Sequence, residues 1–290
     1  MQQTINGLAV GSIYALLGLG VTLIWGVLHV LTFTHAQVLT WGAFATLAAL
    51  NADWPVPVAI LVGMLAAGAI SAAIDAGVLE ALRRRGASEH AFVVATIGVA
   101  AMMQALLKKR TGSRFEPYPR DGFPKGPVEL FGQNIPKLQI LVLAVSLVAM
   151  VLLAAWLRYT SFGRGLRAVA YSRETAELLG VNARLASATA YFVSGALAAL
   201  AGVFVSVNTA QVSYSSGDRL LLVAFAVIVL GGMGSVAGAV VGGLALGVIE
   251  TYATVHVSSK FSEACAYLVI LVVLLVRPSG LFGAKEAVRV

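Results

Sequence analysis

The chain has 290 residues, of which 59% are hydrophobic and only 11% are charged, and its formal net charge is +7. Soluble domains carry about a quarter charged residues, so this composition excludes a soluble globular protein and indicates an integral membrane protein. The positive charge does not require nucleic acid as a partner, because membrane proteins collect Lys and Arg in their loops.

Apolar segments of about 20 residues recur along the chain and predict an all-α, polytopic bundle of membrane helices within a single transmembrane domain, 1–290. We expect about nine spans, at 5–28, 36–51, 55–80, 91–107, 138–157, 185–207, 219–231, 235–257 and 262–277. The pair at 219–257 has a second interpretation, one span followed by a half-crossing segment, which leaves about eight crossings. Asp218 is expected to cap the helix that begins at Arg219.

Two polar features lie within or beside these spans. Thr34, His35 and Gln37 form an intramembrane cluster, which is a functional candidate by default, although a buried structural histidine is an equal alternative. Asp75, Glu80 and the run 83–85 are expected to form an interfacial charge cluster, with Glu80 and Arg84 at helical i,i+4 spacing.

A glycine-rich stretch separates the last apolar runs, and it contains Gly231, Gly232, Gly234 and Ser235. A helix break there would expose backbone polar groups, which is tolerable only against protein or a water-filled path. Interrupted helices of this kind often carry substrate sites in transporters. Close helix packing through small residues is the alternative.

Two connections between the spans are long and polar. The 108–137 segment is rich in proline, which prevents regular helix through much of it, so we expect a folded surface loop with aromatic anchors. A loop devoted to binding a partner is the alternative. The anchors are Phe115, Tyr118, Phe123 and Phe131.

The second connection, 158–184, reads RYTSFGRGLRAVAYSRETAELLGVNAR. Ser172 can cap a short helix, Glu174 suits its positive first turn, and Gly180 is a natural C-terminal stop. Placing this segment in the cytoplasm puts eleven of the 20 Lys and Arg residues inside and nine outside, so 108–137 becomes external. An amphipathic linker on anionic lipid is the alternative interpretation of 158–184.

Several chemistries have no motif in this chain. There is no G-x-x-x-x-G-K-[ST] phosphate loop, no H-E-x-x-H and no G-x-S-x-G. The four histidines lack metal-ligand spacing, and the single cysteine, Cys265, cannot form a disulfide within one chain. We therefore expect no catalytic residue, no metal site and no enzyme activity in this chain.

Four stretches resemble one family in order and spacing. They are GLAVGSIYALLGLGVTLIWG followed by TFTHAQVLTWGAF, TSFGRGLRAVAYSRETAELLGVN, VIVLGGMGSVAGAVVGGLALGVIE, and the tail VRPSGLFG. Together they resemble the LivH-type permeases of branched-chain amino acid ABC transporters, in which the Glu174-Thr175-Ala176 stretch corresponds to the loop that docks on an ATPase subunit. The family's Asn, Ala and Gly at the first break appear here as Thr32, Thr34 and Ala36, with Gln37 where an acidic residue is common, whereas Phe33 and His35 are kept.

The resemblance implies a multi-pass permease subunit of an ABC importer in a bacterial or archaeal cytoplasmic membrane. It would translocate branched-chain or related amino acids; urea, short amides or aromatic acids are alternative substrates because of the departures. The implied partners are two ATP-binding cassette subunits, which bind ATP and Mg, a second identical or homologous permease, and an external or periplasmic solute-binding protein. A secondary carrier or channel is a weaker alternative, because Asp75, Glu250 and Glu263 form no obvious ion site.

The resemblance also implies two sets of functional residues. The substrate pathway would be lined by Thr32, Phe33, Thr34, His35, Gln37, Gly231, Gly232, Gly234 and Ser235. Coupling to the ATPase would use Arg164, Arg167, Arg173, Glu174, Ala176, Glu177, Leu179 and Gly180.

Overall fold

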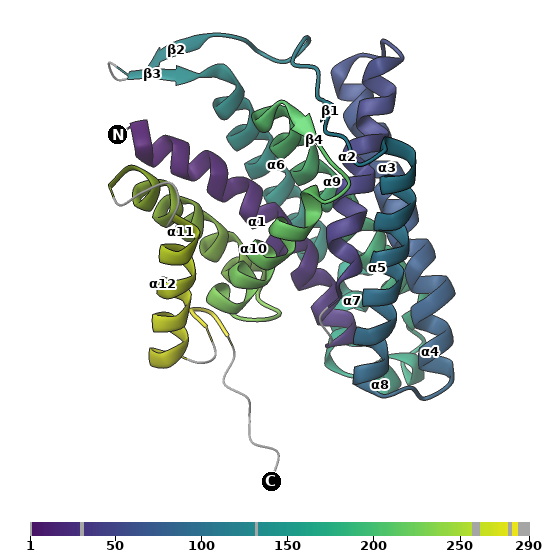
Figure 1. The fold of residues 1–290 in the computed structure, drawn as a ribbon. Helices are drawn as coiled ribbons and strands as arrows, with labels where there is room; N and C mark the ends of the chain where they lie inside the picture. The colour runs from purple at the N-terminus through teal and green to yellow at the C-terminus, as the bar shows by residue number, and fades with distance from the viewer. Residues whose placement is uncertain (1, 30–31, 131–132, 257–261, 278–279, 284–290) are drawn as a thin grey trace. The chain divides into compact units, whose positions relative to one another are not determined.

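The computed structural model describes residues 2–29, 32–130, 133–256, 262–277 and 280–283. Within these ranges the chain is mainly helical, as the sequence predicts, and a helix corresponds to each expected span (Figure 1). The long helices are α1 (Gln2–Leu28), α2 (Thr34–Asn51), α3 (Val56–Ile74), α5 (Glu89–Thr111), α6 (Lys137–Tyr159), α9 (Ala183–Thr209), α10 (Ser216–Gly231), α11 (Val236–His256) and α12 (Ser262–Val276). A π-helical turn, η1 (Asp75–Leu79), and α4 (Glu80–Arg84) continue α3, while α7 (Ser161–Tyr171) and α8 (Arg173–Leu178) connect α6 to α9.

Six helices in the described part of the chain are long and apolar enough to cross a membrane. They are α1, the continuous α3–η1–α4 helix, α5, α6, α9 and α11. Helices α2, α10 and α12 are shorter, with 18, 16 and 15 residues. The chain is therefore a multi-pass membrane protein, and the count of eight or nine crossings stays a prediction.

The chain divides into two compact units. Unit 1 comprises Met1–Thr22, Pro124–Val148 and Leu222–Val290, and unit 2 comprises Leu23–Phe123 and Ala149–Leu221. Helices α1, α6 and α10 therefore contribute residues to both units.

The core of unit 2 is formed by α2, α3 and α9, which pack against one another. Small residues allow this close approach: a Cβ atom on Gly195 of α9 would lie 2.5 Å from the carbonyl oxygen of Ala67 on α3. In the most apolar 18-residue stretch of each helix, 78% of the α9 stretch is buried inside the protein, whereas only 22% of the α5 stretch is. The exposed apolar side chains of α5 suit contact with lipid, because lipid tails are as apolar as these side chains.

Unit 1 contains α11 packed against the first part of α1. A Cβ atom on Gly247 would lie 2.2 Å from the backbone nitrogen of Gly11, so a larger residue there would force the helices apart. The hydroxyl of Tyr14 donates a hydrogen bond to Glu250 at 2.7 Å, which gives this carboxylate a partner within the apolar helix pair. A short antiparallel hairpin, β2 (Pro127–Leu130) and β3 (Gln133–Pro136), also belongs to unit 1.

The 108–137 connection lacks helix between Thr111 and Lys137 in its described residues, as its prolines predict. In unit 2, β1 (Glu116–Pro117) pairs antiparallel with β4 (Gln211–Val212), just after α9. Tyr118 and Phe123 are buried, with 3% and 6% of their surface exposed, and burial raises the pKa of the Tyr118 phenol. This part of the loop is folded onto the unit; the predicted anchor Phe131 lies outside the described residues.

Candidate functional site

The predicted short helix in the 158–184 connection is present as α8. The Ser172 hydroxyl accepts a hydrogen bond from the backbone nitrogen of Thr175 at 3.2 Å, which caps the helix as expected. Glu174 lies in the first turn, and Gly180 follows the helix with a φ of +81°, a left-handed conformation that favours glycine. The local signals in the sequence were therefore sufficient to place this helix.

An additional amphipathic helix, α7, precedes α8 and was not predicted separately. Thr160 caps it by accepting a hydrogen bond from the backbone nitrogen of Gly163 at 3.0 Å, and Leu166 and Val169 are buried on its inner face. The cap and the helical spacing of these apolar residues are signals that could have identified it. The connection is therefore a helical pair.

The outer surface of this pair carries large apolar side chains. Tyr171, Leu178 and Leu179 are 84%, 88% and 77% exposed. Apolar residues gathered on a surface of this kind mark sites of interaction with protein or membrane. Leu179 is among the residues predicted to take part in coupling, whereas Tyr171 and Leu178 are not.

The other predicted coupling residues have different environments. Arg164, Arg167, Glu174, Glu177 and Gly180 are exposed, and Arg173 is half-buried. Ala176 is only 1% exposed, so its methyl group packs α8 onto the protein and is not part of the outer surface.

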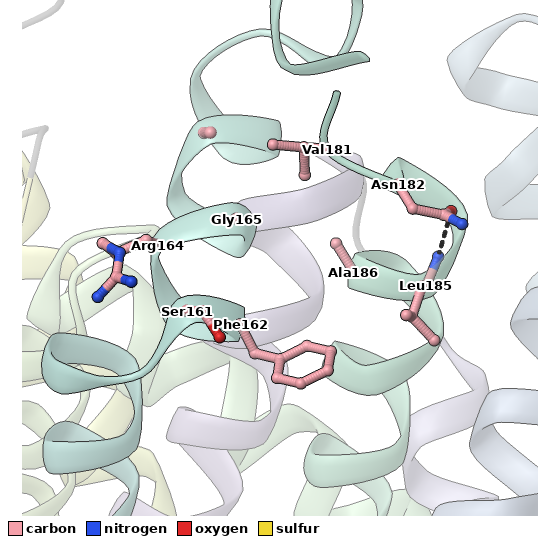
Figure 2. A pocket seen from close by; sticks show the side chains of 9 residues that line it. Ser161, Phe162, Arg164, Gly165, Val181, Asn182, Leu185 and Ala186 are labelled. Atoms are coloured by element: carbon pink, nitrogen blue, oxygen red, sulfur yellow. Dashed lines mark hydrogen bonds between the residues drawn. The ribbon is translucent and has the colours of Figure 1, made fainter. Parts of the chain in front are cut away.

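A pocket of about 450 Å³ lies between α7 and the start of α9 (Figure 2). Phe162, Val181, Ala186 and Leu185 give it a mainly apolar lining, and Arg164 extends from α7 on the opposite side. Beside it, Asn182 caps α9 by accepting a hydrogen bond from the backbone nitrogen of Leu185 at 3.1 Å. The pocket is therefore a feature of the α7–α9 corner of unit 2.

The carboxylate of Glu80 connects α8 to α4 and α9. It contacts Arg173 of α8 at 3.3 Å and Arg184 of α9 at 2.8 Å, in addition to Arg83 at 3.0 Å and Arg84 at 3.5 Å within its own helix. The sequence predicted the Glu80–Arg84 pair. It gave no signal for Arg173 and Arg184, because they lie about a hundred positions away and approach Glu80 only in the folded unit.

A second carboxylate, Asp75, lies within η1 and is buried, with 2% of its surface exposed. It contacts the Arg83 guanidinium at 2.5 Å and accepts a hydrogen bond from the hydroxyl of Ser187 on α9 at 3.0 Å. Arg83 therefore bridges Glu80 and Asp75 across the π-helical turn. Buried charges need partners of this kind, which explains why Asp75 is paired with Arg83 and Ser187.

The Thr32–Gln37 segment spans the start of α2 and is held by α5 and α9. The ring nitrogen Nδ1 of His35 lies 3.3 Å from the hydroxyl of Ser194 on α9, and the backbone nitrogen of Phe33 donates to Thr96 on α5 at 3.4 Å. Thr32, Thr34, His35 and Gln37 are each at most 2% exposed, and Phe33 is half-buried.

Three side-chain atoms of this segment are buried without a hydrogen-bond partner among the described residues. They are Oγ1 of Thr32, Nε2 of His35 and Oε1 of Gln37. An unsatisfied buried polar atom costs about 1–3 kcal/mol, so each such atom needs an explanation, such as water or a ligand that it contacts during function.

Asp218 has a different role from the predicted cap. Helix α10 begins at Ser216, because a turn stabilised by a hydrogen bond from the Ser213 backbone nitrogen to Ser216 Oγ at 2.8 Å starts the helix earlier. Asp218 therefore lies inside the first turn, where its carboxylate accepts hydrogen bonds from Gln37 at 2.9 Å and Gln104 at 2.6 Å.

The predicted glycine-rich break separates α10 from α11. Gly232 and Gly234 have φ values of +102° and +84°, and the Ser235 hydroxyl accepts a hydrogen bond from the backbone nitrogen of Gly238 at 3.0 Å. Gly231 and Gly232 are buried, whereas Gly234 is exposed. The sequence thus located both the break and its glycines.

The described part of the C-terminal tail lies on this break. The backbone nitrogens of Leu281 and Phe282 donate to the carbonyl oxygens of Leu230 and Gly231, both at 2.9 Å. These bonds satisfy carbonyl groups that the end of α10 would otherwise leave without partners. The glycine-rich break and the C-terminal tail, which are separate motifs in the sequence, therefore form one structure.

The predicted pathway residues fall into two groups. The Thr32–Gln37 residues belong to unit 2, and the Gly231–Ser235 residues belong to unit 1. Among the described residues, no three His, Cys, Asp or Glu side chains are grouped so that they could hold a metal ion.

Comparisons with known proteins cover nearly the whole chain. A family model described as branched-chain amino acid transport system, permease component, matches residues 3–277. The high-affinity branched-chain amino acid transport system permease protein LivH of Salmonella typhimurium is 30% identical, over 100% of this chain and 97% of that protein. The corresponding protein BraD of Pseudomonas aeruginosa is 29% identical, over 100% of this chain and 98% of its own length.

A relative whose name gives a different substrate is also similar. The autoinducer 2 import system permease protein LsrC of Salmonella paratyphi B is 29% identical, over 78% of this chain and 64% of that protein. The matched residues 3–277 include the α7–α8 connection, the Thr32–Gln37 segment and the α10–α11 break.

Proposed function

Because this chain belongs to the family of branched-chain amino acid transport system permease components, we propose that it is the membrane-spanning subunit of an ABC importer. The cargo is a branched-chain or related amino acid, as in the names of its full-length relatives. The protein is a transporter subunit rather than an enzyme, and the bond chemistry belongs to its partners.

The proposed assembly contains two ATP-binding cassette subunits, a second permease and an external solute-binding protein in a bacterial or archaeal cytoplasmic membrane. ATP and Mg bind to the cassette subunits, since this sequence has no phosphate loop. Family membership over residues 3–277 is the observation that carries this proposal.

Helix α8 is the proposed contact with the ATPase. It is capped at Ser172, it ends before Gly180, and it presents Leu178 and Leu179 outward. Apolar side chains of this size are typical of the centre of a protein interface. In the proposed cycle, closure of the ATPase subunits moves α7 and α8, and this movement switches the path between outward and inward access.

The proposed path includes the Thr32–Gln37 segment and the α10–α11 break. The buried Thr32, His35 and Gln37 atoms without a partner among the described residues support this assignment, because passing solute or water can satisfy them. Such uncharged hydrogen-bonding groups also suit urea or a short amide. These solutes, with aromatic acids, are the second candidate cargo.

Reconstitution tests the proposed function. The chain is co-purified with the ATP-binding and solute-binding proteins of its organism and placed in liposomes. ATP is supplied on the side of the membrane where the ATPase lies, and labelled leucine is added. Competition by isoleucine but not by urea, acetamide or phenylalanine supports the branched-chain cargo. The chain alone should neither hydrolyse ATP nor accumulate solute; accumulation driven by an ion gradient without any ATPase would overturn the importer proposal.

A further inference from the structure

Helix α8 cannot hold its own orientation. It has six residues, and isolated helices need about 12–15 residues to be even marginally stable in water. The described contacts that hold it to the rest of unit 2 include the buried methyl group of Ala176 and the Arg173–Glu80 ion pair. The ion pair is directional, so it fixes where α8 lies relative to α4.

Glu80 is well placed for this role because its side chain is only 9% exposed. Arg173 is 31% exposed, and the pair is therefore shielded from solvent far more than an ordinary surface salt bridge. Exposed surface pairs contribute little to stability, whereas a pair that is shielded in this way is screened less by salt and holds its two partners more firmly.

From Glu80 the contacts continue into the membrane helices through one side chain. Nη1 of Arg83 donates to Glu80 at 3.0 Å, and Nη2 of the same guanidinium contacts Asp75 at 2.5 Å and the Ser187 hydroxyl at 3.1 Å. The planar guanidinium holds these partners in a fixed geometry. Asp75 lies in η1 and Ser187 in α9, so the series of contacts runs from α8 to both elements.

The turn between Asp75 and Glu80 is π-helical. A π-helical turn contains an extra residue relative to an α-helix, is rare, and is frequently found at functional sites. If Glu80 shifts and Arg83 passes this shift to Asp75, the shift acts across the π-helical turn. The helix can change its register at this turn and so accommodate the shift.

We propose that Glu80 is a positioning residue of the transport cycle, which holds α8 and passes its movement through Arg83 and Asp75 to η1 and α9. The inference rests on the proposed function in one respect, that α8 is the element the ATPase moves. It adds the residue through which the membrane helices sense that movement.

The main test compares Glu80→Gln with Arg84→Gln in the complete complex. Arg84 is the matched control, because it contacts the same carboxylate from the same helix but is 59% exposed, and its described ion pair involves no residue of α8. Glu80→Gln should leave the ATPase bound but reduce transport per ATP hydrolysed by roughly fivefold or more, whereas Arg84→Gln should change it less than about twofold. Equal ratios for the two variants would overturn the proposal.

A second pair of variants decides the matter if Glu80→Gln lowers the amount of assembled complex. Arg173→Gln removes the link from the α8 side and leaves Glu80 with three other arginines, while Arg173→Lys keeps the charge. Coupling should be lost in Arg173→Gln and restored in Arg173→Lys, with the ATPase bound in both. Retained coupling in Arg173→Gln overturns the inference about Glu80. Failure of the unaltered chain to bind any ATPase contradicts the proposed function instead.

Discussion

The side-chain nitrogen of Gln37 donates a hydrogen bond to Asp218 at 2.9 Å, although the two residues are 181 positions apart in the sequence. Gln37 lies in the first turn of α2, and its side chain is 2% exposed. Asp218 lies in the first turn of α10. The bond therefore joins the beginnings of α2 and α10, and it fixes Gln37 in one orientation.

Replacing Gln37 with leucine should lower the free energy of unfolding by about 1 kcal/mol, because Asp218 is exposed and water can partly replace the lost donor. Combining it with Asp218→Asn should cost less than the sum of the single changes. Denaturation of the purified protein measures both values. The control is Gln139→Leu, at a half-buried glutamine whose Oε1 has no described hydrogen-bond partner. An equal loss of stability in this variant would contradict a specific Gln37–Asp218 interaction.

His35→Leu should alter transport while the complex still assembles. The change removes the buried Nε2 that has no partner among the described residues, and a lost hydrogen bond to solute raises KM by about threefold to tenfold. Uptake kinetics in liposomes provide the measurement. Thr40→Val is the control, since Thr40 is buried further along α2 and its hydroxyl donates, among the described residues, only to its own helix, to Ala36 at 3.0 Å. Similar kinetics for both variants would return His35 to a packing role.

Gly180→Val should separate α8 from its ATPase partner. The φ of +81° at Gly180 strains a β-branched residue by about 1–3 kcal/mol, which shifts the end of α8 and the exposed Leu179 beside it. Co-purified ATPase should fall roughly tenfold. Gly86→Val, at a φ of +62° after α4, imposes similar backbone strain outside α8 and should retain the ATPase.

Charge changes distinguish a docking helix from a linker that lies on anionic lipid. Glu174→Arg reverses the charge in the first turn of α8 and should reduce ATPase binding if α8 is the interface. The lipid interpretation instead predicts little effect from Glu174→Arg and a clear loss of function from Arg164→Gln combined with Arg167→Gln. ATPase co-purification and solute-stimulated hydrolysis are measured for each variant.

Gly232→Ala should release the tail from the α10–α11 break. A Cβ atom there would lie 2.3 Å from the backbone nitrogen of Gly283, at a φ of +102°. The amides of Leu281 and Phe282 should then exchange with deuterium about tenfold faster, which mass spectrometry detects. Gly126→Ala is the control, because its φ is +83° but no atom lies within 4 Å of the added Cβ. Unchanged protection in Gly232→Ala would show that the tail does not depend on this contact.

The sequence by itself determined the helical membrane class, the positions of the long helices and the local structure of α8 and of the glycine-rich break. These features depend on residues near one another in the chain: runs of apolar side chains, the Ser172 cap, and glycines such as Gly180 and Gly232 that adopt positive φ. Local physics acts over a few residues, so a single sequence displays it.

Only the tertiary structure decided which distant polar groups meet. Glu80 with Arg173, Asp75 with Ser187, and Gln37 with Asp218 are joined by the packing of separate helices, and Asp218 changed from a predicted cap to an acceptor between two glutamines. The tail likewise reached the α10–α11 break through space. No spacing rule connects such residues, because their approach depends on how small side chains let whole helices pack, and that is a property of the fold rather than of any segment.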